Sequence, residues 1–292
     1  MEELKNRIDF VYVWDVVDGN PNGDPATGDN SPRIEDDTDL GLASDACIKR
    51  KIRNYVDTVK QGIPGYDIFI RDKVILNNIV NDVYSEDSIK NIEETKGGNE
   101  KERAATKLIC QRYFDARTFG AVLTRGSNNN AGQLRGPVQI TFSKSIDPID
   151  CQKHVLDRIA VATPEEAEKQ KGNNHTMGSK YIVPYGLYKC YGFISANLAR
   201  QTGFNSDDLQ LLWQALENMF DLDHSAGRGL MTARKLIIFK HDSEFGNIQA
   251  DTLFRSVNIK KTIEGVPRDF SDYKITIDRK MIPENVECKE LL

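Results

Sequence analysis

Four aspartates surround a loop near the start of the chain, and they are the first residues whose type and spacing could carry chemistry: Asp15, Asp18, Asp24 and Asp29. Closely spaced carboxylates can hold Mg²⁺ for phosphodiester hydrolysis, because this ion prefers hard oxygen ligands. Aspartate is also common in loops for a structural reason, since its side chain accepts hydrogen bonds from nearby backbone N–H groups. No His-x-x-x-His, Ser–His pairing or Walker motif accompanies the four carboxylates. We therefore predict no catalytic residue, no metal and no cofactor.

A group of cations follows this loop on a helix predicted at 42–60. Apolar residues recur there at the 3.6-residue period, so that one face should be buried: Ile48, Ile52, Tyr55, Val56 and Val59. The same helix carries Lys49, Arg50, Lys51, Arg53 and Lys60. Cations on the arc beside the apolar face could reach a phosphate chain, or they could form an ordinary solvated face.

Two glycine-containing loops could bring a phosphate close to the backbone. Gly19-Asn20-Pro21-Asn22-Gly23-Asp24-Pro25 follows the first predicted strand, and its open amides suit an anion or another chain. Ala226-Gly227-Arg228-Gly229 adds a cation to glycines that have no Cβ. The second loop has an alternative interpretation as an ordinary connecting turn.

The stretch from Pro164 to Lys180 contains almost nothing to bury except Ala167 and Met177, so it should project from a compact domain as an arm. Its segment His175-Thr176-Met177-Gly178-Ser179-Lys180 places one apolar side chain among polar and basic neighbours. An exposed methionine could wedge between stacked bases or lie against a neighbouring subunit. Disorder of the segment is the third alternative.

The remaining elements must position these groups. Alternating apolar residues predict strands near 8–16, 136–142, 185–198 and 236–239, with a short strand region at 66–80. A second helix, capped by Asn205 or Ser206, carries an apolar stripe, and 85–107 is a polar excursion. The order strand, helix, strands, helix, strand is typical of an α+β, ferredoxin-like (RRM-like) plan with long insertions. Tyr191 and Phe193 share one strand face there, and we expect them to fill the core under the helix that carries Trp213 rather than to stack on bases.

Composition limits the class of protein. The chain has 292 residues, enough for one large domain, and a net charge of −5. The acidic balance argues against indiscriminate nucleic-acid binding but leaves a local basic groove possible. The five cysteines form no Cys-x-x-Cys pair, and no apolar run reaches membrane-spanning length. We expect a cytoplasmic protein with reduced thiols and no membrane partner.

Four motifs occur together along the chain in this order: Asp15-Val16-Val17-Asp18-Gly19-Asn20-Pro21-Asn22-Gly23-Asp24-Pro25, Lys49-Arg50-Lys51-Ile52-Arg53, Gln133-Leu134-Arg135-Gly136-Pro137-Val138-Gln139 and Thr176-Met177-Gly178-Ser179-Lys180. With them the chain closely resembles the backbone subunits of the CRISPR type I-C Cascade surveillance complex, which belong to the Cas7 family of the RAMP superfamily. The resemblance spans most of the chain, from residue 7 to about residue 240.

The resemblance implies a hand-shaped protein. A single domain over 1–292 would form an RRM-like palm, with a finger-type insertion at 81–107 and a thumb-type insertion at 148–184. Several copies would form a helical filament along one guide CRISPR RNA and present it for pairing with target DNA. Each thumb, with Met177 near its tip, would fold over the RNA and kink it. The other implied partners are the large subunit and RNA-end subunit of Cascade and a recruited helicase-nuclease.

A filament subunit must accept any guide sequence, so its contacts should go to phosphates and 2′-hydroxyls and leave base edges free. We expect RNA-binding side chains at Lys49, Arg50, Lys51, Arg53, Arg117, Gln133, Arg135, His175, Met177, Lys180 and Arg228. Type I relatives imply no enzymatic activity. In related type III complexes the equivalent loop supplies a cleaving aspartate, so the alternative function is a metal-dependent ribonuclease acting through Asp24. A third alternative is a free-standing RRM-like RNA-binding protein.

Overall fold

The structure is a computed structural model that describes residues 2–92, 100–123, 133–171 and 175–292. Residues 93–99 of the predicted polar excursion therefore lie outside the described residues. Within the described ranges, no helix is both long enough and apolar enough to cross a membrane.

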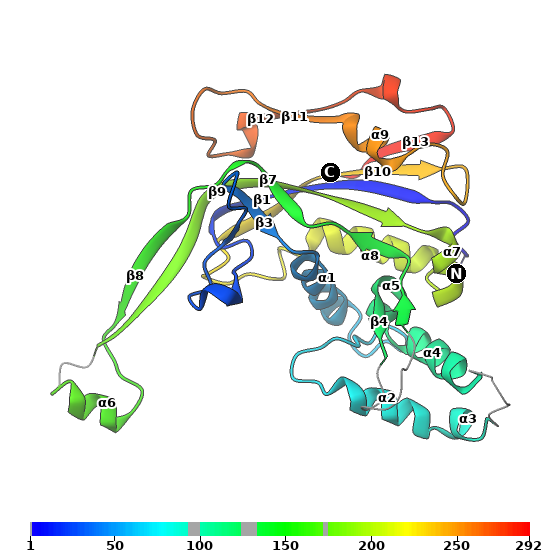
Figure 1. The fold of residues 1–292 in the computed structure, drawn as a ribbon, viewed down its shortest axis with the longest axis horizontal. Helices are drawn as coiled ribbons and strands as arrows, with labels where there is room; N and C mark the ends of the chain where they lie inside the picture. Colours follow the sequence, from blue (N-terminus) through cyan, green and yellow to red (C-terminus); the bar gives the residue numbers. More distant parts are fainter. Residues whose placement is uncertain (1, 93–99, 124–132, 172–174) are drawn as a thin grey trace.

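A large antiparallel sheet forms the centre of the fold (Figure 1). Its strand order is β13 (Val286–Glu290), β10 (Leu230–His241), β1 (Ile8–Gly19), β9 (Thr176–Ile194), β7 (Ser143–Pro148), β3 (Leu40–Ala43) and β2 (Arg33–Ile34). Two further strands, β6 (Val138–Ile140) and β8 (Gln152–Arg158), also pair with β9. The four strands predicted outside 66–80 are confirmed, although β9 begins well before the predicted start at 185. The predicted mixture of helices with antiparallel strands is confirmed as well.

Two helices cover one face of this sheet. They are α1 (Asp45–Val59) and α8 (Ser206–Asn218), which follow β3 and the short helix α7 (Ala196–Thr202) respectively. On α1 the predicted apolar face is buried at Ile48, Ile52 and Val56. The predicted cap of α8 is confirmed, since the Asn205 side chain accepts hydrogen bonds at the helix start within a capping box. Aromatic rings fill the layer between helices and sheet, including Trp14 stacked on Tyr188.

The C-terminal residues cover the opposite face. Helix α9 (Ala250–Arg255) and the hairpin of β11 (Val257–Lys261) and β12 (Tyr273–Ile277) form a layer over the sheet, drawn in orange and red in Figure 1. The Tyr191 ring stacks on Phe254 at a centroid distance of 4.4 Å, and Phe193 meets the same ring edge-on. Both aromatics therefore pack inside the protein as predicted, but they lie against α9 and not under the helix that carries Trp213, because their strand face is the opposite one. Two short 3₁₀ helices flank β12, at Phe270–Asp272 before it and at Arg279–Met281 after it.

A second, mostly helical unit lies beside the main core. It contains α2 (Leu76–Ser85), α3 (Asp87–Lys90), α4 (Glu100–Arg112), α5 (Phe114–Phe119) and the pair β4 (Gly120–Val122) and β5 (Gln133–Arg135). The predicted strand region at 66–80 is wrong. Ile68 and Phe69 are buried, but α2 occupies the end of this range and the preceding residues make one isolated bridge, Asp67 with Tyr113. The excursion at 85–107 was expected to lie outside any core, and that expectation is wrong, because Ile89 and Ala105 are buried in the hydrophobic core of this unit.

A long hairpin projects from the sheet (Figure 1). Strand β8 pairs with the first half of β9, from Gln152 opposite Ile182 to Arg158 opposite Thr176. The short helix α6 (Pro164–Lys169) lies at the far end. Nearly all side chains of the hairpin are exposed, which confirms the predicted arm.

Candidate nucleic-acid interface

Four segments that are far apart in the sequence meet at the end of β1 and line an open groove of about 590 Å³. They are the loop at 20–33, which includes the 3₁₀ turn Pro25–Thr27, the first turns of α1, the hairpin base at Ser179–Tyr181 and the loop at 225–228 before β10. We call this feature the α1 groove. It brings together the two glycine-containing loops, the basic helix and the arm.

Close backbone contact holds the loop at 225–229 against the end of β1. A Cβ on Gly19 would collide with the backbone carbonyl of Arg228, and a Cβ on Gly229 would collide with the backbone of Val17 and Asp18. Gly229 also has φ +60°, in the left-handed region that favours glycine. These glycines therefore shape one wall of the groove.

The first loop positions the start of α1. Asn22 Oδ1 accepts hydrogen bonds from the backbone N–H of Ser44 at 2.8 Å and from its hydroxyl at 3.1 Å. Ser44 in turn is the N-cap of α1, accepting from Cys47 N–H. Asp24 accepts a hydrogen bond from the Ala26 N–H at 3.0 Å and forms an ion pair with Arg33 at 3.3 Å. The Asp24 carboxylate is thus engaged in structural contacts.

Cations dominate the lining of the groove. Among the described residues that line it, one carboxylate, that of Asp29, faces five cationic side chains: Arg33, Arg50, Lys51, Lys180 and Arg228. Asp24 and Asp223 lie just outside this lining and pair with Arg33, Lys51 and Arg228, so five cations meet three carboxylates here in a chain whose net charge is −5. The N-terminus of the 15-residue helix α1 adds the positive end of a helix dipole at the same place. The arrangement suits an extended anionic ligand.

Asp223 pairs with two of these cations. Its carboxylate forms ion pairs with Lys51 Nζ and with Arg228 Nη1. The Lys51 side chain is 4% exposed, whereas that of Arg228 is 40% exposed. Lys51 therefore acts mainly as a buried partner of Asp223, which corrects the expectation that it faces RNA. Arg228 keeps surface that a ligand can reach.

Tyr181 ties the hairpin base to the first loop. Its hydroxyl donates a hydrogen bond to the Asp29 carboxylate. This bond lowers the pKa of Asp29, so the carboxylate stays charged at neutral pH. The contact fixes Lys180, the preceding residue, at the rim of the groove.

Neither a metal centre nor a reactive thiol stands out in the groove. No three His, Cys, Asp or Glu side chains in the described ranges come close enough to hold a metal ion. Burial raises the pKa of the Cys47 thiol. The thiol is therefore protonated at neutral pH and is a poor nucleophile.

Arg53 lies inside the protein, which corrects the expectation that it faces a phosphate chain. Its Nε is 2.7 Å from Asp115 Oδ2. The same carboxylate accepts hydrogen bonds from the N–H groups of Phe69 at 2.6 Å and Ile70 at 3.1 Å. The partner stands 62 residues further along the chain, so the ion pair joins α1 to α5 and to the segment before α2.

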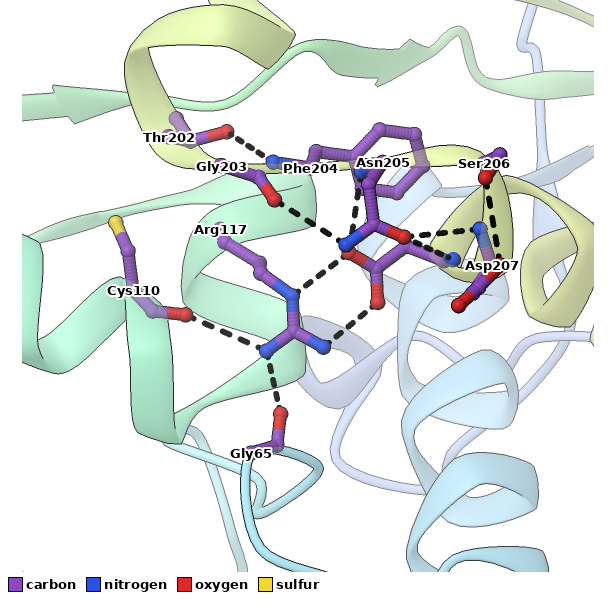
Figure 2. A network of polar contacts seen from close by, with 10 residues as sticks. Gly65, Cys110, Arg117, Thr202, Gly203, Phe204, Asn205, Ser206 and Asp207 are labelled. Atoms are coloured by element: carbon purple, nitrogen blue, oxygen red, sulfur yellow. Dashed lines mark hydrogen bonds and ion pairs between the residues drawn. The ribbon is translucent and has the colours of Figure 1, made fainter. Parts of the chain in front are cut away.

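Arg117 is buried as well, and the same correction applies. Its guanidinium makes two parallel contacts with Asp208 of α8, from Nε to Oδ2 at 2.9 Å and from Nη2 to Oδ1 at 2.6 Å. Its Nη1 donates to the carbonyls of Gly65 at 2.5 Å and Cys110 at 3.3 Å (Figure 2). Asp208 also belongs to the capping box of α8 with Asn205. We call these two buried Arg–Asp pairs on α5 the α5 junction.

Other predicted RNA contacts lie outside the groove. Lys49 forms an ion pair with Asp45 on α1 at 2.9 Å. Gln133 and Arg135 are exposed on β5, and each lines a separate hollow near α7. The structure does not bring these three side chains together.

His175 and Met177 lie near the far end of the hairpin. His175 Nδ1 is 2.6 Å from Asp157 Oδ2, and Met177 pairs with Asp157 in the ladder. The Met177 side chain is 78% exposed. Neither residue lines the α1 groove.

Sequence reasoning missed two residues of the groove, Arg33 and Tyr181. Arg33 stands beside the acidic stretch Glu35-Asp36-Asp37, which conceals its role when charge is counted along the chain. The sequence did contain a signal for Tyr181. Period-two alternation places it on the same strand face as Met177, which was a predicted RNA contact.

The structure is a mixed α/β protein with a groove lined mainly by cations, and sequence comparison gives the family. The chain matches the family model of CRISPR-associated protein Cas7 over residues 6–278, and it belongs to that family. The Cas7 protein of Haloferax volcanii is 27% identical over 237 residues. That alignment spans 73% of this chain and 65% of the relative's length. The family-level resemblance predicted above is confirmed.

Two solved structures contain chains that align with most of this one. One is described as a CRISPR RNA-guided surveillance complex, pre-nicking, with TM-score 0.45, 13% identity and coverage of 80% of this chain and 75% of the other. The second, a CRISPR RNA-guided surveillance complex, has TM-score 0.45, 12% identity and coverage of 80% and 68%. TM-scores below 0.5 are too low to infer a shared ligand or assembly.

Proposed function

We propose that this chain is a repeated backbone subunit that binds guide CRISPR RNA through the α1 groove without regard to sequence. The observation that carries the proposal is the charge of the groove, where five lining cations outnumber Asp29 and the paired carboxylates of Asp24 and Asp223 in an acidic chain. An RNA strand carries one negative charge per nucleotide and matches such a local excess. Membership of the Cas7 family supports the same ligand.

The open cations are the proposed phosphate contacts. Arg50 and Lys180 are exposed in the groove, and Arg33 and Arg228 line it while paired with Asp24 and Asp223, whereas Lys51 is paired below the surface. Contacts of this kind hold the backbone and leave base edges free for pairing with target DNA. Lys49, Gln133, Arg135, His175 and Met177 remain proposed contacts outside the groove.

The strand order supports the assignment of a palm, a finger-type insertion and a thumb-type insertion. The order β10, β1, β9, β7, with α1 after β1 and α8 after β9, supports our assignment of an RRM-like palm. We assign the finger-type insertion at 81–107 to the α2–α4 unit. We assign the thumb-type insertion at 148–184 to the β8–β9 hairpin, with Met177 near its far end.

The proposed partners follow from this role. They are guide RNA, target DNA, further copies of the chain, the large and RNA-end subunits of a type I-C Cascade and a recruited helicase-nuclease. Each copy needs only a few phosphate contacts, because affinity accumulates along a filament. The proposal includes a cytoplasmic location, supported by five free cysteines.

RNA titration tests the proposal. RNAs of two unrelated sequences, each in a short and a long form, are mixed with the purified chain, and affinity and particle mass are measured. We expect equal affinity for the two sequences and particles that grow with RNA length. A monomer with a preference for one short sequence would instead support a free-standing RRM-like protein.

We propose no enzymatic activity. Asp24, the candidate for the ribonuclease alternative, caps a turn and pairs with Arg33, which favours a structural role. The test is incubation of the RNA-loaded chain with complementary RNA and Mg²⁺. Cleavage at regular spacing that disappears in Asp24→Ala would overturn the proposal in favour of the ribonuclease.

A further inference from the structure

A second hollow, with a volume of about 370 Å³, lies at the end of the sheet where β1 begins and β10 ends. Its lining comes from Arg7 before β1, Arg135 on β5, residues 193–198 at the end of β9 and the start of α7, and Glu244 and Phe245 in the loop after β10. Figure 1 shows α7 and the N-terminus at the end of the sheet opposite to the β8–β9 hairpin. We call this feature the Phe245 hollow.

An exposed aromatic ring stands on a firmly held loop at this hollow. Phe245 is 76% exposed. Its carbonyl accepts a hydrogen bond from Arg7 Nη1 at 3.3 Å, and the Ser243 carbonyl accepts one from the Arg7 N–H at 3.0 Å. Buried His241 accepts a hydrogen bond at Nδ1 from the Asn247 N–H at 2.9 Å. A ligand that covers the ring therefore has little loop motion to restrict, which favours binding.

One cation at the hollow is uncompensated. Arg135 is exposed, and its guanidinium forms no ion pair or hydrogen bond with any residue in the described part of the chain. The other charged residues of the lining are paired, Arg7 with buried Asp9 at 2.9 Å and Glu244 with Arg200 at 3.2 Å. The hollow thus offers one free positive charge and one open aromatic ring.

Close backbone packing fixes the position of Arg135. The residue pairs with Gly120 across β4 and β5. A Cβ on Gly120 or on Gly136 would collide with the backbone of the opposite segment. The Pro137 carbonyl accepts a hydrogen bond from the Ser195 N–H at 3.1 Å, which ties this segment to the start of α7. The guanidinium therefore extends from a defined point at the edge of the hollow.

A nucleotide carries groups that suit both features. Aromatic side chains stack on the bases of single strands, and cations hold their phosphates. Stacking accepts every base, so such a contact keeps binding independent of sequence. The volume of the hollow falls within the range of about 300–1,000 Å³ that is usual for small-ligand sites.

We infer that the Phe245 hollow holds one nucleotide of the bound RNA strand, with its base on the Phe245 ring and its phosphate on Arg135. This inference rests on the proposed function, which supplies the RNA strand. The 12 residues of β1 separate the hollow from the α1 groove by about 40 Å, at about 3.3 Å per residue. The nucleotide in the hollow therefore belongs to a part of the strand that the groove of the same copy does not hold.

Variants of the ring and of the cation test the inference separately. Phe245→Ala, Phe245→Trp and Arg135→Ala are compared with wild type on RNAs of increasing length and at several salt concentrations. Phe142→Ala is the matched control for the ring, since Phe142 is 51% exposed and lies outside the lining of the hollow. UV crosslinking of RNA that carries iodouridine, followed by mass spectrometry of the peptides, reports which side chains contact the bases.

On long RNA we expect Phe245→Ala to weaken binding at least about fivefold, which corresponds to about 1 kcal/mol for one stacked base. Its salt dependence should not change, because stacking releases no counterions. Phe245→Trp should bind as wild type does. Arg135→Ala should make the slope of log affinity against log salt shallower by about 0.7, the value for one phosphate contact on a single strand. Iodouridine should crosslink to Phe245.

RNA too short to leave the α1 groove should bind equally to wild type and to all these variants, and Phe142→Ala should match wild type at every length. Wild-type affinity of Phe245→Ala on long RNA, or crosslinks that avoid Phe245, would overturn the inference and leave the proposed function intact. A crosslink to Phe245 that forms only after complementary DNA is added would assign the hollow to DNA and also overturn it. Failure of the wild-type chain to bind short and long RNA alike would overturn the proposed function together with the inference.

Discussion

The α1 groove and the α5 junction are built from the same residue types but differ in role: the groove is open to a ligand, and the junction joins elements of the fold. Each combines arginine or lysine with aspartate, and each receives a cation from α1. In the groove, Arg50 is exposed and lines an open surface. In the junction, Arg53 lies three positions further along the same helix and is enclosed with Asp115. The difference teaches that burial, set by the packing partners, decides whether a cation binds a ligand or joins elements of the fold.

The two regions should therefore respond differently to mutation. Removing one partner of a buried ion pair leaves an uncompensated charge, which is strongly destabilising. Removing an exposed cation costs little stability. The variants below are ordered by the loss of free energy of unfolding that we expect.

Arg117→Met should have the largest effect. It leaves the Asp208 carboxylate buried without its bidentate partner, and it frees the carbonyls of Gly65 and Cys110. We expect a loss of about 3–5 kcal/mol in the free energy of unfolding, measured by denaturant titration. A loss below about 1 kcal/mol would show that the junction is not a stabilising element. RNA affinity of the fraction that remains folded should be unchanged.

Arg53→Met should be the next most harmful. Asp115 would keep two hydrogen bonds from backbone N–H groups, so its charge is only partly uncompensated. We expect a loss of about 2–3 kcal/mol by the same titration. If the variant instead kept its stability and lost RNA affinity, Arg53 would belong to the groove and the comparison would fail.

Gly229→Ala tests the wall of the groove. The residue has φ +60°, and a Cβ would collide with the backbone of Val17 and Asp18. We expect a loss of about 1–3 kcal/mol of stability and a displaced Arg228. Gly227→Ala is the matched control, because a Cβ there meets nothing nearby, and it should be close to wild type.

Asp24→Ala should cost about 1 kcal/mol, the usual effect of losing a capping side chain. It also releases Arg33 from its ion pair, so RNA affinity should stay equal or rise. Thermal unfolding and RNA titration on the same sample check both effects. A fall in RNA affinity would mean that Asp24 positions Arg33 for the ligand.

Local patterns predicted much of the framework. The strands around β1, β9 and β10 and the cap at Asn205 followed from alternation and capping residues, which are local signals. The strand predicted at 66–80 failed because Ile68 and Phe69 bury their side chains without joining a ladder. An apolar run predicts that a segment is buried, but it does not determine whether the backbone of that segment pairs with another strand.

The site was predictable only in part, for a related reason. Cations on the basic helix, on the arm and in the loop at 225–229 were expected to contact one ligand, and Arg50, Lys180 and Arg228 line the same groove. The burial of Arg53 and Arg117 depends on ion pairs with aspartates that stand 62 and 91 residues away in the sequence. Such pairings are set by tertiary packing, and no local pattern around either arginine carries them.

The central claim is that the open cations of the α1 groove hold RNA phosphates, and the salt dependence of RNA binding tests it most directly. Arg50→Ala with Lys180→Ala is compared with wild type and with Lys260→Ala combined with Lys274→Ala, a matched pair of exposed lysines on β11 and β12. Stability of the groove variant should stay within about 0.5 kcal/mol of wild type.

We predict that the groove variant binds two unrelated RNA sequences more weakly by the same factor. Its slope of log affinity against log salt should become shallower by about 1.4, since each lost phosphate contact on a single strand removes about 0.7. The control pair should keep the wild-type slope. An unchanged slope in the groove variant, or a loss confined to one RNA sequence, would contradict the account.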